Sequence, residues 1–367
     1  MKIVADDKIP YLRGVFEKFA EVVYLSGKSI TPEDVADADA LIVRTRTRCN
    51  KALLGKSKVR FVATATIGFD HINGAELAEC GIKWSNAPGC NADSVKNYIS
   101  SALAVSETEL SGKTVGIVGV GHVGSRVAVA AKALGMNVLL NDPPRAEKEG
   151  ADGFVELDEL LAKSDIVTLH VPLERAGKYP TLNMADGNFF SKMRDGAWFF
   201  NSCRGEVVEE KALIHAKKTG KISLALMDVW PNEPDLSKEL LDAVDLGTPH
   251  IAGYSADGKA NGTAAAVQFI ARELGISELV SWKPEVLPEP VYEKIIDLSD
   301  VRSPYEALKK AILHAYDIRR DCDALRNEPE NFEMLRGNYW IRREFSAYTV
   351  INAPSEIREN LDLLGFK

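Results

Sequence analysis

Three short segments carry side chains suited to acid–base chemistry: an arginine, a glutamate and a histidine. They are Arg204 in NSCRG, Glu233 in DVWPNEP and His250 in TPHIAGY. A planar guanidinium can hold a carboxylate and polarise a carbonyl. An imidazole that titrates near neutral pH can take or give a proton, and a carboxylate can orient it. Hydride transfer between a 2-hydroxy acid and a nicotinamide cofactor requires this set, because the cofactor itself carries the hydride.

Each of these side chains also has a plain structural interpretation. Arg204 could be a partner in a surface salt bridge, Glu233 could simply be solvated, and His250 could cap a turn. Cys203 could act as a nucleophile, but no motif pairs it with a second histidine. The prediction of chemistry therefore depends on the three segments meeting at one place.

A glycine-rich turn stands earlier in the chain, where Gly119, Gly121 and Gly124 form a G-x-G-x-x-G between an apolar strand and a helix. In dinucleotide-binding folds these glycines allow a tight turn, a close approach of the backbone to the pyrophosphate and close helix packing. Asp142 ends the next apolar strand, where its carboxylate can bind the ribose hydroxyls and repel a 2′-phosphate. This pattern predicts NAD, although Arg145 nearby could tolerate NADP and a glycine turn can exist without a ligand.

The elements that must position these residues follow from hydrophobic patterning. Short unbroken apolar runs alternate with helical periodicity, which predicts an α/β fold with parallel sheets buried on both faces. The expected strands are residues 2–5, 22–24, 37–43, 59–64, 114–120, 137–142, 165–172, 198–203 and 222–229. The expected helices are residues 12–19, 93–109, 127–135, 157–164, 209–220 and 260–274, the last of which could pack back against the first domain.

Composition narrows the class of protein further. The chain has 367 residues, 46% of them hydrophobic, and a formal charge of −8. It can bury two or three cores, and its acidic balance argues against a protein that mainly coats nucleic acid or an anionic membrane. No apolar run reaches the roughly 18 residues of a spanning helix. The two acidic residues near the start, Asp6 and Asp7, precede any apolar core of a signal peptide, so we expect a soluble cytoplasmic protein. Because the five scattered cysteines form no C-x-x-C pair, we expect reduced thiols and no metal site.

The motifs and their order resemble the D-isomer-specific 2-hydroxyacid dehydrogenases over about residues 1–275. The resemblance implies two Rossmann-like doubly wound domains, a substrate-binding one at 1–92 and 257–285 and an NAD-binding one at 93–256. It implies Arg204 as the substrate-binding catalytic arginine, Glu233 as the partner of the histidine and His250 as the acid/base. The cofactor positions that it implies are Gly119, Gly121, His122, Val123, Gly124, Asp142, Val171, Ser202, Cys203, Arg204, Asp228 and Gly253.

Further stretches are similar to a branch of that family with a phosphorylated 2-hydroxy acid as substrate. They are VRTRTR at 43–48, ATATIGFDHIN at 63–73, APGCNADSV at 87–95, NDPPRA at 141–146 and HIAGYSADGKANGT at 250–263. The resemblance implies substrate contacts from Thr45, Thr66 and Tyr254. The tail, with AYDIRRD and NYWIRREFSAYTVI, resembles the added C-terminal domain of that branch, which implies a small α+β domain at 286–367 that forms a homodimer.

The arginines of VRTRTR also suggest an anion by themselves. Arg44, Arg46 and Arg48 alternate, so in an extended segment they would share one face. Three guanidiniums on one side repel one another unless they meet solvent or an anion, and a phosphate dianion suits them. We therefore add Arg44 and Arg46 to the expected substrate contacts, with an exposed edge or a surface loop as the alternative. Tyr254 could give its hydroxyl to the substrate or merely pack.

Other functions remain open on the sequence alone. The chain could act on a different 2-hydroxy acid of the family, such as 3-phosphoglycerate. It could be a non-catalytic NAD-sensing scaffold that binds protein partners, although it lacks a disordered tail and a basic localisation run. The tail beyond the proline-rich linker at 281–290 could instead bind a small regulatory molecule.

Overall fold

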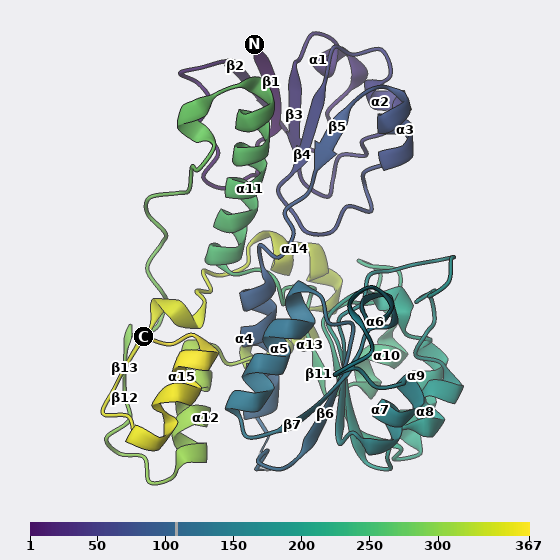
Figure 1. Ribbon diagram of the computed structural model, residues 1–367, viewed down its shortest axis with the longest axis vertical. Helices are drawn as coiled ribbons and strands as arrows, with labels where there is room; N and C mark the ends of the chain where they lie inside the picture. The colour runs from purple at the N-terminus through teal and green to yellow at the C-terminus, as the bar shows by residue number, and fades with distance from the viewer. Residues whose placement is uncertain (107–108) are drawn as a thin grey trace. The chain divides into compact units, whose positions relative to one another are not determined.

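The chain forms two compact units, each built on a parallel β-sheet (Figure 1). The computed structural model describes residues 1–106 and 109–367. The first unit comprises Met1–Asn91 and Ser255–Glu289, and the second comprises Ala92–Tyr254 and Pro290–Lys367. The two sheets and a small third sheet in the tail confirm the expected α/β fold class.

The first unit contains five strands, which are β1 (Lys2–Asp6), β2 (Glu21–Leu25), β3 (Ala40–Val43), β4 (Phe61–Thr64) and β5 (Lys83–Ser85). They pair in the parallel order β2-β1-β3-β4-β5, and both β3 and β4 are buried at every residue. Its helices are α1 (Pro32–Val35), α2 (Lys51–Leu54), α3 (Gly74–Glu79), α11 (Ala256–Leu274) and the short η2 (Ser277–Leu279).

Helix α11 packs against β4 in the first unit. Gly262 permits this approach, because a Cβ atom there would lie 2.5 Å from the carbonyl oxygen of Ala65. Ser255 caps the start of the helix by accepting a hydrogen bond from the Gly258 N–H, and Gly275 ends it in the left-handed conformation. The chain thus returns to the first sheet after residue 254.

The helix expected over residues 12–19 is wrong, because this segment forms a series of turns. Leu12, Val15 and Phe16 are buried in the core of the first unit, and their spacing is what suggested a helix. Gly14 has a φ of +84°, which a right-handed helix does not accommodate. These side chains are therefore buried by turns and not by a helix.

The described residues of the second unit form a main sheet from β6 (Thr114–Val118), β7 (Asn137–Asn141), β8 (Ile166–Leu169), β9 (Ala197–Asn201), β10 (Ile222–Met227) and β11 (Leu246–Gly247). All pair in parallel, in the order β11-β10-β9-β8-β6-β7. The connections that leave β6 and β8 run in opposite directions along the sheet. In doubly wound folds, ligands bind outside the carboxyl ends of the strands at such a switch point.

The helices of the second unit that precede the tail are α4 (Ala92–Ala104), α5 (His122–Ala133), α6 (Pro143–Glu149), α7 (Leu157–Lys163), α8 (Gly187–Lys192), α9 (Glu210–Lys218) and α10 (Lys238–Ala243), with the short η1 (Gly205–Val207). The helix expected over residues 93–109 corresponds to α4, and residues 107 and 108 lie outside the described part of the chain. Apolar residues of β8 and β9 are buried on both faces of the sheet by these helices.

The tail adds β12 (Ile295–Asp297), β13 (Thr349–Ile351), α12 (Pro304–Ala315), α13 (Arg319–Asn327), α14 (Phe332–Gly337) and α15 (Arg358–Leu364), with η3 (Pro329–Asn331), η4 (Phe345–Ala347) and η5 (Ser355–Ile357). Helix α12 lies against α4, α15 against α5 and α13 against β11 (Figure 1). The tail belongs to the same compact unit as the six-stranded sheet and shares one hydrophobic core with this sheet and its helices.

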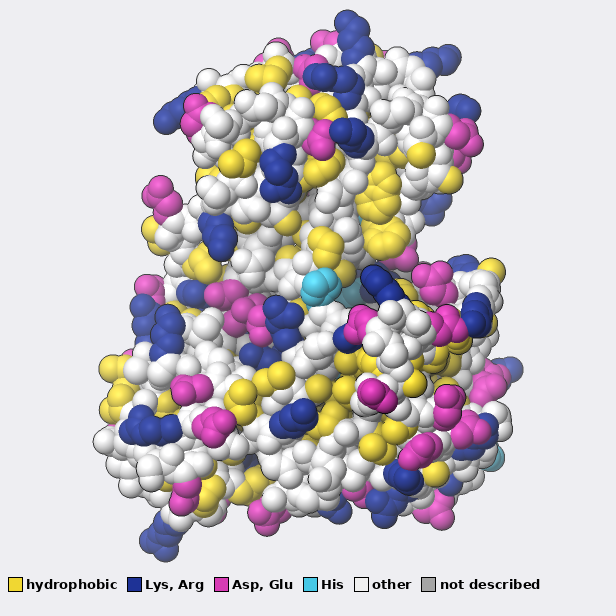
Figure 2. Space-filling model, in the orientation of Figure 1, with side chains coloured by type: hydrophobic (Ala, Val, Ile, Leu, Met, Phe, Trp, Pro, Cys, Tyr) yellow, Lys and Arg dark blue, Asp and Glu magenta, His cyan; other side chains and the backbone are white. Residues whose placement is uncertain are grey.

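The surface carries both signs of charge. On the face shown in Figure 2, acidic and basic side chains are interspersed over both units. Within the described residues, no helix is both long and apolar enough to cross a membrane.

Close packing of α7 on β6 depends on Gly116, which makes its replacement by alanine a test of the fold. A Cβ atom at Gly116 would lie 2.3 Å from Leu160 Cδ2 and 2.5 Å from Ser164 Oγ, both fully buried. We expect Gly116→Ala to lower the free energy of unfolding by about 1–3 kcal/mol. Gly187→Ala, at an exposed helix start with nothing within 4 Å, should change it by less than about 0.5 kcal/mol. Urea unfolding measures both, and equal midpoints for the two variants would contradict the packing role of Gly116.

Candidate active site

The three predicted catalytic segments follow three neighbouring strands of the second unit. Arg204 lies just beyond the end of β9, Glu233 beyond β10 and His250 beyond β11. Because the strands are parallel and adjacent in the order β11-β10-β9, their carboxyl ends meet at one edge of the sheet. The structure therefore brings the three segments to the same edge.

Close contacts join these segments to one another. A Cβ atom at Gly205 would lie 2.0 Å from the backbone carbonyl carbon of Trp230, so the turn that carries Arg204 sits directly on the loop after β10. Trp230 Nε1 donates a 2.9 Å hydrogen bond to the carbonyl oxygen of Thr248, which links that loop to the segment carrying His250. Trp230 is 2% exposed, so its side chain is buried between the loop after β10 and the segment that carries His250.

Glu233 and His250 form the central pair of the site. Glu233 Oε2 lies 2.7 Å from His250 Nδ1, and Glu233 Oε1 accepts the Trp230 N–H at 2.8 Å. Burial raises the pKa of Glu233, but the hydrogen bond and charge of His250, the Trp230 N–H and the charge of Arg336 outweigh burial and hold this pKa below its usual value. The carboxylate is therefore ionised at neutral pH and can stabilise an imidazolium.

Asp228 fixes the backbone that carries His250. Its oxygens accept hydrogen bonds from the N–H groups of Ile251 and Ala252, at 2.8 and 2.9 Å, and from the Thr248 hydroxyl at 2.6 Å. Burial raises the pKa of Asp228, against the effect of the His250 charge and these donors. His250 has a φ of +56°, which a non-glycine residue adopts at a cost of about 1–3 kcal/mol. The bonds to Asp228 hold the loop in this strained form.

The turn after β9 presents Arg204. Asn201 is fully buried, and its side chain donates to the carbonyl oxygen of Arg204 and accepts the Cys203 N–H. Arg204 Nη1 donates to the carbonyl oxygen of Cys203 at 2.7 Å. Burial raises the pKa of the Cys203 thiol to about 11, so this cysteine is a neutral thiol at physiological pH and not an activated nucleophile.

The glycine motif forms the turn between β6 and α5. Gly119 has a φ of +86°, and a Cβ atom there would lie 2.6 Å from the carbonyl oxygen of His170, in the segment after β8. A Cβ atom at Gly124 would lie 2.0 Å from the carbonyl oxygen of Gly119. Helix α5 begins at His122, so the N–H groups of His122 and Val123 open the helix. The turn thus stands at the switch point of the sheet.

Several features of this edge fit a dinucleotide. A Cβ atom at Gly121 would meet nothing within 4 Å, so the backbone there is open to close approach. Ser202 Oγ is buried and has no hydrogen-bond partner within the described residues. Asp142 accepts the N–H groups of Val120 and Arg145, at 2.8 and 3.0 Å, which leaves acceptor capacity on both oxygens.

Arg145, which left NADP open, is held in other interactions. Its guanidinium pairs with Glu149 at 2.6 Å and donates to the carbonyl oxygen of Val120. It also lies over the ring of Phe154, 5.5 Å from the ring centre. These contacts occupy the group that would have to bind a 2′-phosphate. Val171 and Gly253 follow β8 and β11, at the same edge as the glycine turn.

The first unit carries Thr66 in a chain of hydrogen bonds. The Thr66 hydroxyl lies 2.8 Å from Thr64 Oγ1, which lies 3.0 Å from His71 Nε2, and it donates to Gly68 O at 2.9 Å. Burial lowers the pKa of His71 to about 4, against the charge of Asp70, so its imidazole is neutral at pH 7. The sequence reasoning missed His71 as a partner of this threonine pair, and the ATAT motif nearby was the available signal.

The expected alternation of Arg44, Arg46 and Arg48 on one face is wrong. Strand β3 ends at Val43, and the following residues form a turn in which Thr47 is buried and donates to the carbonyl oxygen of Gly27. Arg44 Nε lies 3.4 Å from the buried carboxylate of Asp6, whereas Thr45, Arg46 and Arg48 are exposed. The repeat of period two had suggested a strand, but the chain turns at this point to leave the sheet.

Two arginines of the tail also reach the loop that carries His250, and sequence reasoning did not identify them. Arg342 is 1% exposed and donates to the carbonyl oxygens of Ile251 and Ala252 and to the Ser94 hydroxyl. Arg336 donates to the Tyr254 hydroxyl at 2.9 Å. The repeated arginines of the tail were a signal, but the spacing did not show which loop they contact.

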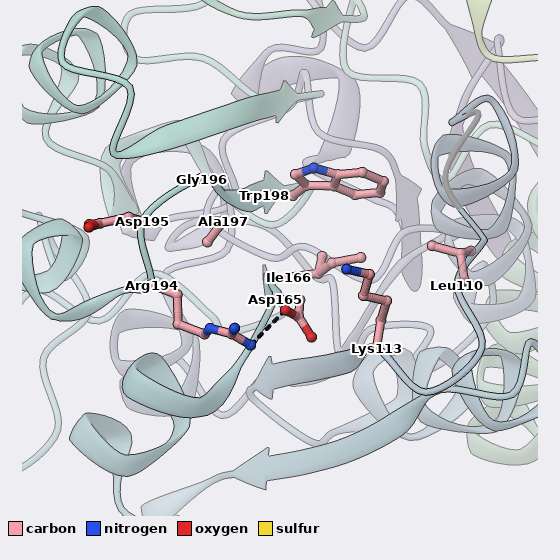
Figure 3. Close-up of a pocket in the computed structure, with 9 residues that line it drawn as sticks. All are labelled: Leu110, Lys113, Asp165, Ile166, Arg194, Asp195, Gly196, Ala197 and Trp198. Carbon is pink, nitrogen blue, oxygen red and sulfur yellow. Dashed lines mark hydrogen bonds and ion pairs between the residues drawn. The ribbon is translucent and has the colours of Figure 1, made fainter.

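A separate cavity lies at the opposite edge of the same sheet (Figure 3). Asp165 and Trp198, at the amino ends of β8 and β9, line it, and Arg194 pairs with Asp165 at 2.6 Å. This cavity therefore lies apart from the catalytic segments. Within residues 1–106 and 109–367, no cluster of three or more His, Cys, Asp or Glu side chains is arranged to hold a metal ion.

Known proteins show the same organisation. The model of the D-isomer specific 2-hydroxyacid dehydrogenase NAD-binding domain matches residues 89–252, which confirms the expectation of NAD, and a domain of unknown function matches residues 286–365. The structure of a D-lactate dehydrogenase from Aquifex aeolicus, complexed with NAD and lactic acid, is similar at 25% identity and a TM-score of 0.63, over 79% of this chain and 100% of that one.

Full-length relatives narrow the family further. A protein of Bacteroides fragilis named erythronate-4-phosphate dehydrogenase is 50% identical over 356 residues, which is 96% of this chain and 99% of that protein. A protein of the same name from Escherichia coli is 42% identical over 373 residues, which is 100% of this chain and 98% of that protein. The chain therefore belongs to the D-isomer-specific 2-hydroxyacid dehydrogenases, in the branch formed by the erythronate-4-phosphate dehydrogenases.

Proposed function

We propose that this enzyme oxidises 4-phospho-D-erythronate to (R)-3-hydroxy-2-oxo-4-phosphonooxybutanoate with NAD, in the biosynthesis of pyridoxal 5′-phosphate (vitamin B6). The observation that carries this proposal is the 2.7 Å pair of Glu233 and His250, at the strand edge that also presents Arg204. The name of the full-length relatives supports the choice of substrate.

Arg204 and His250 would divide the work on the substrate. The fork of Arg204 binds the carboxylate of the 2-hydroxy acid and polarises the C2 oxygen as it becomes a carbonyl. With Nδ1–H donated to Glu233, His250 keeps a lone pair on Nε2, which takes the proton of the C2 hydroxyl. Glu233 holds the ring in this orientation and stabilises the imidazolium that results. His250 would thus act as the general base of the oxidation.

The cofactor would lie along the edge formed by the turns after β6, β7, β8 and β9. A nicotinamide ring held at this edge would supply the hydride acceptor for C2 of the substrate. The glycine turn and the N–H groups of His122 and Val123 suit the pyrophosphate, and Asp142 suits the adenosine ribose. The remaining positions that we assign to the cofactor are Gly124, Val171, Ser202, Cys203, Arg204, Asp228 and Gly253.

The phosphorylated substrate would be recognised by hydroxyl and guanidinium groups. Thr45, Thr66 and Tyr254 are the hydroxyl groups that we assign to it, and Arg44 and Arg46 supply positive charge near Thr45. Arg44 is oriented by the buried Asp6 at 3.4 Å, which supports a fixed guanidinium at that turn. A phosphate dianion would complement these donors.

The substrate itself is tested by following NADH absorbance with the purified protein. We expect kcat/KM for 4-phospho-D-erythronate to exceed that for unphosphorylated D-erythronate and for 3-phospho-D-glycerate by at least about 100-fold, because both anionic ends and the chain length must fit. A 2-oxo acid added to the assay tests recycling of the reduced cofactor. Equal or better turnover of 3-phospho-D-glycerate would replace the proposed substrate with that one.

We further propose that the enzyme is a cytoplasmic homodimer that associates through its tail. Ile295 in β12 and Ile351 in β13 are 59% and 39% exposed, and both strands are short and parallel. Hydrophobic side chains also appear at the edge of Figure 2 where these strands lie. Exposed apolar clusters of this kind favour an interface. Free thiols at all five cysteines suit a reducing compartment.

Replacing the catalytic arginine tests the mechanism. We expect Arg204→Lys to lower kcat/KM by about 100-fold while the Kd for NAD changes less than about threefold, because a bidentate fork becomes a point charge. Arg194→Lys, which alters a half-exposed ion pair at the opposite edge of the sheet, should leave both quantities unchanged. Turnover of Arg204→Lys at the wild-type rate would contradict the role of Arg204.

The proposed dimer interface is tested by placing a charge on β12. We expect Ile295→Glu to reduce the mass measured by light scattering from that of two chains to that of one, because a buried carboxylate in an apolar interface is costly. Val129→Glu, at a partly exposed position of α5, should remain a dimer. A dimer that survives Ile295→Glu would place the interface elsewhere.

A further inference from the structure

The helix α14 of the tail contributes a charged side chain to the loop that follows His250. Arg336 Nη2 donates a 2.9 Å hydrogen bond to Tyr254 Oη, and its guanidinium carbon lies over the Tyr254 ring, 5.5 Å from the centre. The Arg336 side chain is 19% exposed. The guanidinium therefore holds the phenol both at its oxygen and at its face.

The charge of Arg336 is directed towards the site rather than absorbed by a short ion pair. Its contact with Glu333, one turn earlier in α14, is long at 3.7 Å. The same charge acts on Glu233, the carboxylate that holds His250. A positive group from the tail thus bonds to Tyr254 and also favours the ionised form of Glu233.

Hydrogen bonds and ring contacts connect the surrounding tail to the same loop. Arg342 lies over the ring of Tyr316, 4.5 Å from its centre, and bonds the backbone of the loop between His250 and Tyr254. Asp321 accepts hydrogen bonds from Tyr316, Tyr339 and Trp340 at 2.8, 2.7 and 3.0 Å. Tyr339 also packs edge-on against Tyr254, with ring centres 6.0 Å apart. Tail and loop form one packed assembly.

We propose that Arg336 is a positioning residue for the oxidation, because it holds the phenol of Tyr254 so that the hydroxyl of Tyr254 donates to the substrate. This inference rests on the proposed function, in which Tyr254 contacts the substrate. A phenol oxygen can accept one hydrogen bond and still donate its own proton. With Arg336 as the donor, the phenol acts as the acceptor in their bond, and its O–H is directed away from the guanidinium.

Kinetics of single and double variants test this role. We expect Arg336→Ala to raise KM for 4-phospho-D-erythronate about tenfold and to lower kcat by less than about threefold, with an unchanged Kd for NAD. Arg336→Lys should recover part of the loss, because an ammonium can still donate to the phenol. In a Tyr254→Phe background, adding Arg336→Ala should change KM by less than about twofold, because the two residues act through one contact.

A matched arginine of the tail separates positioning from mere attachment of the tail. Arg326 of α13 donates to the carbonyl oxygens of Val244 and Asp245, so it also joins the tail to the sheet, but it does not bond to Tyr254. Arg326→Ala should leave KM for the substrate unchanged. Thermal unfolding and light scattering are measured on every variant, so that a loss of folding or assembly is seen directly.

The outcomes separate a failure of the role of Arg336 from a failure of the proposed function. A wild-type enzyme that oxidises 4-phospho-D-erythronate, combined with an Arg336→Ala variant of unchanged KM, would overturn the role of Arg336 and leave the proposed function standing. The same holds if the losses from Arg336→Ala and Tyr254→Phe multiply fully, or if Arg326→Ala reproduces the loss. A wild-type chain without turnover would overturn both.

Discussion

The site depends on one buried carboxylate, Asp228, and on the donors that surround it. Taking a carboxylate out of water costs on the order of several kcal/mol, which three short hydrogen bonds offset here. All three donors belong to the segment between Thr248 and Ala252, which therefore has to wrap around the carboxylate. His250 is carried inside this segment with a φ of +56°. The strained backbone that aims the imidazole is thus a consequence of satisfying Asp228.

The same segment is held from the other side by the tail. Arg342 bonds the carbonyl oxygens of Ile251 and Ala252, whose N–H groups face Asp228. The two residues after His250 therefore bond a buried anion through their N–H groups and a buried cation through their carbonyl oxygens. Both partners lie in one compact unit, so the catalytic loop shares a core with the tail. A tail that only joined two subunits would not need a buried cation at this loop.

Sequence reasoning identified Arg204, Glu233 and His250 by residue type, as candidates whose chemistry required them to meet. Residues that directly follow adjacent parallel strands share an edge of the sheet, and this geometry brings Arg204, Glu233 and His250 together. The glycine motif could also be identified from the sequence. In the structure, Gly119 and Gly124 stand where any Cβ atom would collide with backbone. Local patterns failed where the chain leaves regular structure. The spacing of Leu12, Val15 and Phe16 is that of a helix face, but turns bury these side chains. The spacing of the arginines in VRTRTR is that of a strand, but this segment forms a turn.

The spacing of residues along the chain could not predict contacts between segments that are distant in the sequence. Nothing in the period of the tail indicates that Arg342 meets residues 251 and 252, or that Arg336 meets Tyr254, because those contacts arise from how α12 and α13 pack on α4 and β11. The composition of the tail nevertheless hinted at a buried arginine. Such an arginine needs aromatic and carbonyl neighbours, and Tyr316, Tyr339 and Trp340 cluster in the tail. Aromatic residues interleaved with arginine in an added domain therefore indicate a scaffold for the neighbouring site, in addition to any role in association.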